Sequence, residues 1–306
     1  MNRNVAVVDI GSTSVQISVA TVDQTSMTLL AKEKRLARLA DHLDDQGCLP
    51  ASVIDQLIEI LQAYVAVGKQ YQAIPMITAT ATIRAAKNRD EVITKIHRAL
   101  GLPVRVLTGA DEARLVLNGV LFGHPQLRSQ NILTMDVGVG STELITGSSG
   151  HATTIASVRV GALVVHQRWL GFSGASFAEV KRVRRRLHRR FTNALALSGT
   201  VSVSHLVGTG GSIQRLVRLI RGSVLDTEAI NGVTVSRTAL EACISQLVHA
   251  KTPEARRALP GMDAERADFV LGGGLLFSVA MEALGFEEIL VSTSALRTGM
   301  LTMELT

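Results

Sequence analysis

A short motif occurs twice in this chain and constrains the fold more than any other feature. Residues 5–14 read VAVVDIGSTS, and residues 132–144 read ILTMDVGVGSTEL. In both copies an apolar run that predicts a buried strand ends in an aspartate, followed by an apolar residue, a glycine and small hydroxyl residues. One Asp-x-Gly turn after a strand carries little information. Two copies predict two similar lobes that face one cleft.

The residues of the repeated motif suit an anion-binding site with a carboxylate beside it. Asp9 and Asp136 fall where the two predicted strands end. Glycines let the backbone turn tightly, so that N–H groups point at an anion, and hydroxyl groups add further donors. A carboxylate beside a phosphate cradle is what metal-assisted phosphoryl chemistry requires. The loop donors are Gly11, Ser12, Thr13 and Ser14 in the first copy, and Gly138, Gly140, Ser141 and Thr142 in the second.

The order of predicted elements is typical of an α/β protein with two domains. Strands at 4–9, 15–21 and 27–32 are followed by alternating helices and strands, and the series starts again at residue 131. A chain of 306 residues can form two separate cores. The polar segment at 123–130 gives the boundary. We therefore expect domains at 1–123 and 124–306, with the last helix able to pack back on the first domain.

Composition limits the partners and the location of the protein. The net charge of +6 favours a polyanion such as a phosphate chain, a nucleotide, nucleic acid or an acidic membrane. The aromatic share of 3% weakens any interpretation based on base stacking. The N-terminal apolar run is too short for a signal peptide, and Cys48 and Cys243 show no pairing pattern. We expect a cytoplasmic protein without a membrane partner.

Five segments in a fixed order carry the strongest functional signal. They read DIGSTS at 9–14, ATATIRAAKN at 79–88, GADEARL at 109–115, DVGVGSTEL at 136–144 and GTGGS at 208–212. This set resembles the exopolyphosphatase and guanosine pentaphosphate phosphohydrolase family. RAD at 266–268, the glycines at 272–274 and VSTSALRTGML at 291–301 extend the likeness. The resemblance implies two RNase H-like lobes around a central cleft, as in actin, sugar kinases and heat-shock ATPases.

The resemblance implies roles for four acidic residues. Glu112 matches the catalytic glutamate, which takes a proton from the water that attacks the terminal phosphorus. Asp136 and Glu143 match acids that hold a metal ion and position the water, and Asp9 is expected to support the metal. The implied ion is Mg²⁺, with Mn²⁺ as an alternative. Without the family, Glu112 reads as a surface glutamate paired with an arginine, and the others as turn or strand residues.

The resemblance also implies a set of phosphate-binding groups. Arg84 occupies the arginine position of the family, where a planar guanidinium matches phosphate oxygens. The other expected substrate contacts are Ser12, Thr13, Gly138, Gly140, Ser141, Gly208, Gly210, Gly211, Ser212, Arg266 and Arg297. The plainer interpretation of GTGGS is a strand–helix turn, which is compatible with phosphate binding at a helix N-terminus.

Several positions depart from the family pattern. Thr13 replaces an asparagine, Asp111 replaces the first glutamate of a pair, and Thr298 stands where a glutamate is common. Val139 replaces the central glycine of a Gly-Gly-Gly run. If that position needs a positive φ, a β-branched residue there costs about 1–3 kcal/mol and the loop takes another shape. These changes motivate the hypothesis of a weakly active or inactive protein.

A run of arginines predicts an amphipathic helix. Residues 181–190 read KRVRRRLHRR, and apolar residues recur at helical spacing at 180, 183, 187 and 191. A solvated face is one interpretation, and a track that attracts long polyphosphate is another. Nucleic-acid or anionic-membrane binding stays as a third, although no aromatic platform accompanies the run.

The leading hypothesis is an exopolyphosphatase that removes the terminal phosphate of inorganic polyphosphate by Mg²⁺-assisted attack of water activated by Glu112. Hydrolysis of guanosine pentaphosphate is the alternative, because both substrates end in a phosphoanhydride. A sensor that binds polyphosphate or an alarmone without turnover is a second alternative, and a kinase or ATPase ranks lowest. Nucleic acid is disfavoured as a partner. Homodimerisation stays open, because no interface can be read from the sequence.

Overall fold

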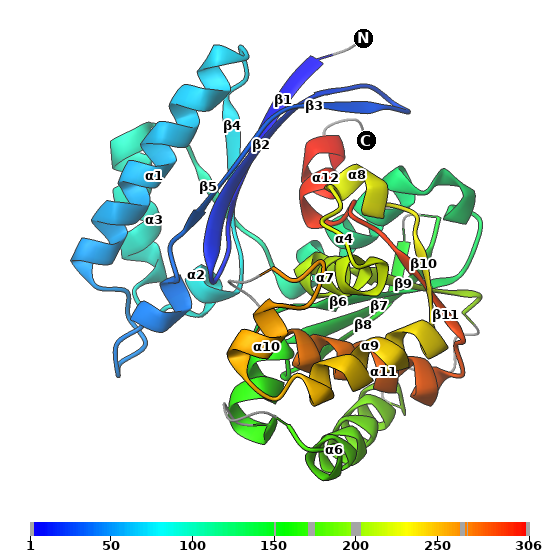
Figure 1. Cartoon of the computed structure of the whole chain (residues 1–306). Coiled ribbons are helices and arrows are strands. Elements are labelled where there is room, and N and C mark those ends of the chain that lie inside the picture. The colour runs from blue at the N-terminus through cyan, green and yellow to red at the C-terminus, as the bar shows by residue number, and fades with distance from the viewer. Residues whose placement is uncertain are drawn as a thin grey trace. The chain divides into compact units, whose positions relative to one another are not determined.

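The computed structural model describes residues 3–149, 151–170, 175–196, 203–263, 267 and 269–303. The chain divides into two units, one comprising Met1–Gly119 and Leu296–Thr306 and the other Val120–Ala295. Each unit has its own mixed β-sheet and its own hydrophobic core (Figure 1). The C-terminal segment is therefore grouped with the N-terminal part of the chain.

The first unit is built on a five-stranded sheet with the order β3-β2-β1-β4-β5. The strands are β1 Arg3–Ile10, β2 Ser14–Val22, β3 Met27–Leu36, β4 Pro75–Ala79 and β5 Val104–Val106. β1, β2 and β3 form an antiparallel meander, whereas β4 and β5 run parallel to β1. Parallel neighbours need crossover connections, and helices supply them here.

Helices cover both faces of this sheet. They are η1 Leu39–His42, α1 Ala51–Gln70, α2 Ala81–Ala85, α3 Arg89–Leu100, α4 Gly109–Gly123, which continues past the division after Gly119, and α12 Leu296–Thr302. Side chains alternate between the faces of a strand. Val8 accordingly packs in one core with Leu57 of α1, whereas Val7 packs in the other with Met300 of α12.

Helix α1 has the length and apolar content of a membrane-spanning helix. Its apolar side faces the core of the first unit, where Ile54, Leu57, Leu61 and Tyr64 are buried. The Tyr64 hydroxyl donates a hydrogen bond to the Val15 carbonyl at 3.1 Å. Core packing thus accounts for the composition of α1.

The second unit repeats the arrangement with one strand more. Its sheet has the order β10-β11-β9-β6-β7-β8, in which β6, β7 and β8 form the meander and β9 and β11 continue in parallel. The strands are β6 Ile132–Val137, β7 Thr142–Ser148, β8 His151–Val158, β9 His205–Thr209, β10 Thr234–Ser236 and β11 Glu288–Val291. The shared order confirms the predicted α/β fold with two similar lobes.

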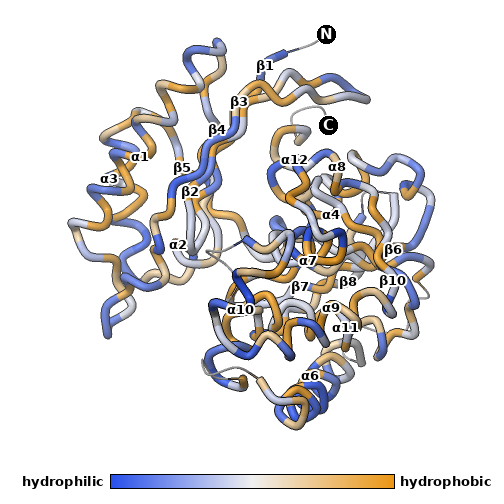
Figure 2. The backbone as a smooth tube through the Cα atoms, viewed as in Figure 1, coloured by the Kyte–Doolittle hydropathy of each residue, from blue (hydrophilic) through white to orange (hydrophobic). Residues whose placement is uncertain are grey.

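Four helices of the second unit, α5, α6, α7 and α9, contact helix α11 Val270–Leu284, whose residues from Val270 to Met281 are buried. Besides α11, the second unit contains η2 Pro125–Leu127, α5 Ala162–Val165, the π-helical η3 His166–Leu170, α6 Phe177–Ala196, α7 Gly210–Arg221, α8 Thr227–Ile230, α9 Arg237–His249 and α10 Pro253–Arg257. Figure 2 shows the contrast between the apolar α11 and the hydrophilic α6.

Candidate active site

Four charged side chains lie near one another in the first unit. Asp9 is at the end of β1, Arg84 is on α2, and Glu112 and Arg297 are in the first turns of α4 and α12. Arg84 Nη1 donates a hydrogen bond to Glu112 Oε2 at 2.5 Å. The charges of Arg297 and Glu112 both act on the Asp9 carboxyl group. We call these four residues the Asp9 cluster.

The sheet topology brings the Asp9 cluster together. β1 and β4 are parallel neighbours, so their carboxyl ends meet at one edge, where ligands of open α/β sheets usually bind. Thr80 N donates to the Ile10 carbonyl at 3.2 Å, which places the start of α2 beside Asp9. Leu107 N donates to the Ala79 carbonyl at 2.9 Å, which places the start of α4 at the same edge.

The Arg84–Glu112 pair joins two different helices. The side chains are 33% and 25% exposed, so solvent and ligands can reach them. Arg84 Nη1 also donates to the Leu107 carbonyl at 2.6 Å, which orients the guanidinium. An ion pair this exposed contributes roughly 0–1 kcal/mol to stability. Its main consequence is that the Glu112 carboxylate is held in a fixed position.

Asp9 is a buried carboxyl group with an unsatisfied oxygen. The residue is 8% exposed, and its Oδ1 has no hydrogen-bond partner in the described part of the chain. Burial raises the pKa of Asp9 to about 6, Arg297 opposes this rise, and Glu112 adds to it. Asp9 is therefore suited to take up a proton or a cation.

The raised pKa of Asp9 predicts a pH-dependent stability. The native state binds this proton more tightly than the unfolded chain, so the stabilisation is complete below pH 3.8 and lost as pH rises through about 6. The loss amounts to roughly 3 kcal/mol of unfolding free energy. Urea unfolding in EDTA measures this loss. As pH rises through about 6, the unfolding free energy of Asp9→Asn should fall by roughly 3 kcal/mol less than that of the wild type. Asp55→Asn, on an exposed position of α1, should keep the wild-type slope.

In the loop after β1, backbone carbonyl groups accept hydrogen bonds from the rest of the unit, whereas two N–H groups stay available for a ligand. Gly11 N donates to the Ser14 carbonyl at 3.0 Å, and the Thr13 carbonyl accepts from Arg38 N at 2.9 Å. The Ser12 hydroxyl accepts from Thr82 Oγ1 at 2.8 Å. Within the described residues, the N–H groups of Ser12 and Thr13 have no partner. These two donors fit the predicted anion loop.

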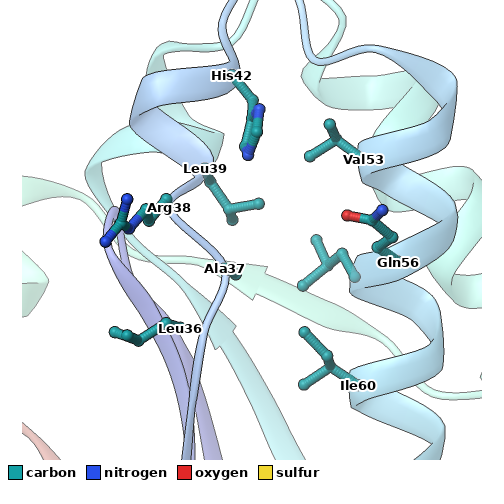
Figure 3. Close-up of a pocket in the computed structure, with 9 residues that line it drawn as sticks. Leu36, Ala37, Arg38, Leu39, His42, Val53, Gln56 and Ile60 are labelled. Carbon is teal, nitrogen blue, oxygen red and sulfur yellow. The ribbon is translucent and has the colours of Figure 1, made fainter.

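A small cavity of about 180 Å³ lies between residues 36–42 and helix α1 (Figure 3). The chain segment that lines one side includes Arg38, whose φ of +46° is unusual for a residue with a side chain. Val53, Gln56 and Ile60 of α1 line the other side. No member of the Asp9 cluster lines the cavity.

The second unit places two carboxylates side by side. Asp136 of β6 lies directly opposite Glu143 of β7 in the antiparallel register. Burial raises the pKa of Glu143, and the Asp136 charge raises it further, whereas the hydroxyls of Ser141 and Ser157 oppose the rise. Ser157 Oγ donates to Glu143 Oε1 at 3.1 Å. Two neighbouring carboxylates repel each other, so a cation between them would be stabilised.

The loop after β6 repeats the turn seen after β1. Gly138 N donates to the Ser141 carbonyl at 3.0 Å, as Gly11 does to Ser14. The Gly138 and Val139 carbonyls accept from the N–H groups of Ala162 and Leu163 in the first turn of α5, at 3.0 and 3.1 Å. Val139 is not among the described residues with a positive φ. The strain considered for this position therefore does not arise.

Restoring a glycine at Val139 should bring no benefit. Val139→Gly relieves no backbone strain and increases the freedom of the unfolded chain, so we expect a loss of about 0.5–1 kcal/mol. Urea unfolding measures this loss, and phosphate release should stay at or below the wild-type rate. A variant that is more stable or several-fold faster would show that the valine strains the loop.

The glycine loop after β9 packs directly on Asp136. Gly210 has a φ of +85°, and a Cβ there would lie 2.5 Å from Asp136 Oδ1. Ser212 Oγ donates to the Val137 carbonyl at 3.1 Å. One turn along α7, the Arg215 guanidinium lies 3.0 Å from the Cβ position of Gly211. A carboxylate, a helix N-terminus and an arginine thus meet in the second unit.

Two residues of this loop already have structural partners. A Cβ at Gly208 would lie 2.8 Å from Ile289 Cδ1, so the glycine permits packing below the sheet. The Ser212 hydroxyl is used in its bond to the Val137 carbonyl. By contrast, a Cβ built at Gly140 would meet no atom within 4 Å among the described residues other than its two chain neighbours. The phosphate contacts of Gly208, Gly211, Ser212 and Gly140 stay predictions, and Arg266 lies outside the described residues.

Asp111 has a structural role that explains the departure at its position. Thr108 N and Thr108 Oγ1 donate to Asp111 Oδ2 at 3.2 and 2.8 Å, and Asp111 N donates to Thr108 Oγ1 at 3.1 Å. This reciprocal pair is a capping box at the start of α4. The bond from Thr108 lowers the pKa of Asp111, with a smaller contribution from Arg105. Sequence reasoning missed this cap and Arg215, although the Thr-x-x-Asp spacing signals a cap.

The described residues contain no group of three or more His, Cys, Asp or Glu side chains placed to hold a metal. The Asp136–Glu143 pair nevertheless suits Mg²⁺, which is commonly held by one or two carboxylates together with substrate phosphates and water. The unsatisfied Oδ1 of Asp9 is a further hard oxygen ligand in the first unit. The predicted metal ligands Asp9, Asp136 and Glu143 stay predictions.

Comparison with solved structures finds the same fold in two bacterial proteins. A family member from Aquifex aeolicus has a TM-score of 0.91 and 24% identity, covering 100% of this chain and 98% of its own. An exopolyphosphatase from Cytophaga hutchinsonii has a TM-score of 0.82 and 23% identity, covering 98% and 97%. Residues 18–306 match the Ppx/GppA phosphatase family. This chain therefore belongs to the Ppx/GppA phosphatase family.

Proposed function

We propose that the protein hydrolyses the terminal phosphoanhydride of inorganic polyphosphate and releases orthophosphate. The Asp9 cluster carries this proposal, because it holds the Glu112 carboxylate against Arg84 next to a loop with available N–H donors. The exopolyphosphatase from Cytophaga hutchinsonii, which shares the fold, supports the choice of substrate. Family membership supports a phosphatase of this type but does not separate polyphosphate from guanosine pentaphosphate.

Glu112 acts as the general base in this proposal. Its carboxylate accepts a proton from water as the water oxygen forms a bond to the terminal phosphorus. The bond from that phosphorus to the bridging oxygen breaks, and the shortened chain leaves with the electron pair. Arg84 holds Glu112 and contributes positive charge for phosphate oxygens.

Asp136 and Glu143 are the proposed ligands of Mg²⁺ or Mn²⁺. A bound divalent ion would neutralise charge that develops on phosphate oxygens. Asp136 is fixed between β7 and Gly210, and Glu143 is oriented by Ser157. The N–H groups of the loop after β6 would bind phosphate beside the ion.

The structure weakens two arguments for an inactive sensor, those based on Asp111 and Val139. The shorter acid at Asp111 caps a helix, and Val139 has an ordinary backbone conformation. Thr298 is 7% exposed, and its carbonyl accepts from Thr302 Oγ1 at 2.9 Å. None of these three residues removes a group from the Asp9 cluster. Turnover is therefore the function that we propose, and cytoplasmic location and homodimerisation stay predictions.

The test is orthophosphate release from long-chain polyphosphate, tripolyphosphate, guanosine pentaphosphate and ATP, with Mg²⁺, with Mn²⁺ and with EDTA. We expect metal-dependent release with the highest kcat/KM on polyphosphate. Faster release from guanosine pentaphosphate would assign the alternative substrate. Tight binding of polyphosphate without release under any of these conditions would show a sensor instead.

A further inference from the structure

Helix α6 has one side that is fully used for packing. Val180, Val183, Leu187 and Phe191 are at most 5% exposed and belong to the core of the second unit. The helix contacts α11 and β8 along this side. Since the apolar residues of this side are buried, they are not available for insertion into a membrane.

The exposed side of α6 carries a stripe of arginines. Arg182, Arg185, Arg186 and Arg189 follow the i, i+3, i+4, i+7 spacing that lines one side of a helix. Together with His188 they line a groove of about 560 Å³. All five side chains are exposed. We call these residues the α6 stripe.

Most charges of the α6 stripe are not neutralised by the protein. Arg184, outside the stripe, donates to Ser278 at 2.7 Å and to Glu241 at 2.6 Å, so its charge serves the packing of the unit. Arg182 has Glu179 at 3.7 Å, with 66% of its side chain exposed. In the described parts of the chain, Arg185 and Arg189 have no carboxylate within 4.0 Å. Like charges one turn apart destabilise a helix, and a bound polyanion would relieve that cost.

The tryptophan beside the stripe does not offer an open ring for base stacking. The guanidinium groups of Arg186 and Arg190 lie over the Trp169 ring, at 5.9 and 5.6 Å from its centroid. Trp169 is the single tryptophan of the chain. The α6 stripe thus offers cations for phosphate but no platform of the kind that single-stranded nucleic-acid binders use.

Trp169 also links the stripe to the loop after β6. It lies on η3, which continues α5, and the first turn of α5 donates to the carbonyls of Gly138 and Val139. The contacts from this loop to Arg186 and Arg190 are continuous within the second unit. The stripe and the predicted phosphate loop are therefore connected by contacts within the second unit.

We propose that the α6 stripe is a binding site for internal phosphates of long-chain polyphosphate, separate from the groups that act on the terminal phosphate. This inference rests on the proposed function for the identity of the polyanion. It assigns the stripe to substrate retention and not to chemistry. Long chains gain affinity from it, and chains of three phosphates do not.

The test uses the triple variant Arg182→Gln/Arg185→Gln/Arg189→Gln. This variant keeps Arg186 and its contact with the Trp169 ring. We expect binding of labelled long-chain polyphosphate in EDTA to weaken at least tenfold. The slope of log Kd against log salt should fall by about 2, since each phosphate contact contributes roughly 0.7. The rate of phosphate release from tripolyphosphate should stay unchanged. Arg185→Gln alone should give a smaller shift in the same direction and serves if the triple variant unfolds.

The matched control is the triple variant Lys69→Gln/Arg98→Gln/Arg221→Gln, which removes three exposed positive charges that are not on α6. It should weaken long-chain binding less than threefold. Equal affinities of the wild type and the stripe variants would overturn the proposal. Tighter binding of a single-stranded oligonucleotide or phosphatidylserine vesicles, lost in the triple variant, would overturn the choice of partner. Stripe-dependent polyphosphate binding without phosphate release would leave this inference standing and refute the proposed hydrolysis.

Discussion

Glu112→Gln should lower kcat for phosphate release about a thousandfold with little change in KM. The amide keeps the size of the side chain and can still accept the hydrogen bond from Arg84, but it cannot take up a proton from water. Loss of a general base typically costs a factor of 10² to 10⁴. A thousandfold loss corresponds to about 4 kcal/mol of activation free energy. The measurement is steady-state phosphate release at saturating polyphosphate.

The control for this variant is Glu59→Gln, which removes an exposed carboxylate from α1 in the same unit. Its kcat should equal that of the wild type, and both variants should keep the wild-type melting temperature. If Glu112→Gln retained more than a tenth of the wild-type kcat, another group would have to be the base.

Gly210→Ala should damage stability and activity together. A non-glycine residue at a φ of +85° costs roughly 1–2 kcal/mol, and the added Cβ would lie 2.5 Å from Asp136 Oδ1. The Asp136 carboxylate would have to move, because 2.5 Å is shorter than an ordinary contact between an oxygen and a Cβ atom. A displacement of about 1 Å at a reacting site can cost a factor of 10². We expect that loss in kcat and a higher Mg²⁺ concentration for half-maximal rate.

Gly285→Ala separates backbone strain from displacement of Asp136. Gly285 has a φ of +72°, and apart from its chain neighbours a Cβ there would meet no atom within 4 Å in the part of the chain that the structure describes. Urea unfolding should show a similar backbone cost in both variants, whereas kcat should fall only in Gly210→Ala. If the two variants lost the same activity, Asp136 would not depend on the glycine for its position.

The sequence predicted the strands and turns that carry Asp9 and Asp136, because local signals determine them. An apolar run followed by Asp-x-Gly-x-x-Ser gives a strand and a tight turn, and both copies have the same 3.0 Å hydrogen bond. The glycines at 272–274 lie within α11, although glycine disfavours helices. Gly273 and Gly274 lie close to Ser212 and Ile244, so tertiary packing requires small residues there.

Other features depend on contacts that no local pattern reveals. The conformation at Val139 follows from bonds to Ala162 and Leu163, more than twenty residues away. The run of arginines gave no indication that Arg184 pairs with Glu241 while its neighbours stay exposed. The burial of Asp9, which raises its pKa, likewise depends on the packing of the whole unit.

The first unit is assembled from both ends of the chain, and this affects the order of events during synthesis. Met300 and Leu301 of α12 complete one of its cores, and Arg297 is the cation that offsets the burial of Asp9. A ribosome delivers these residues after all of the second unit has emerged. The sheet face that packs against α12 is therefore only partly covered, by Leu107 and Leu115, until residues 296–302 have been synthesised, and a polypeptide that stops before α12 lacks Arg297 beside Asp9.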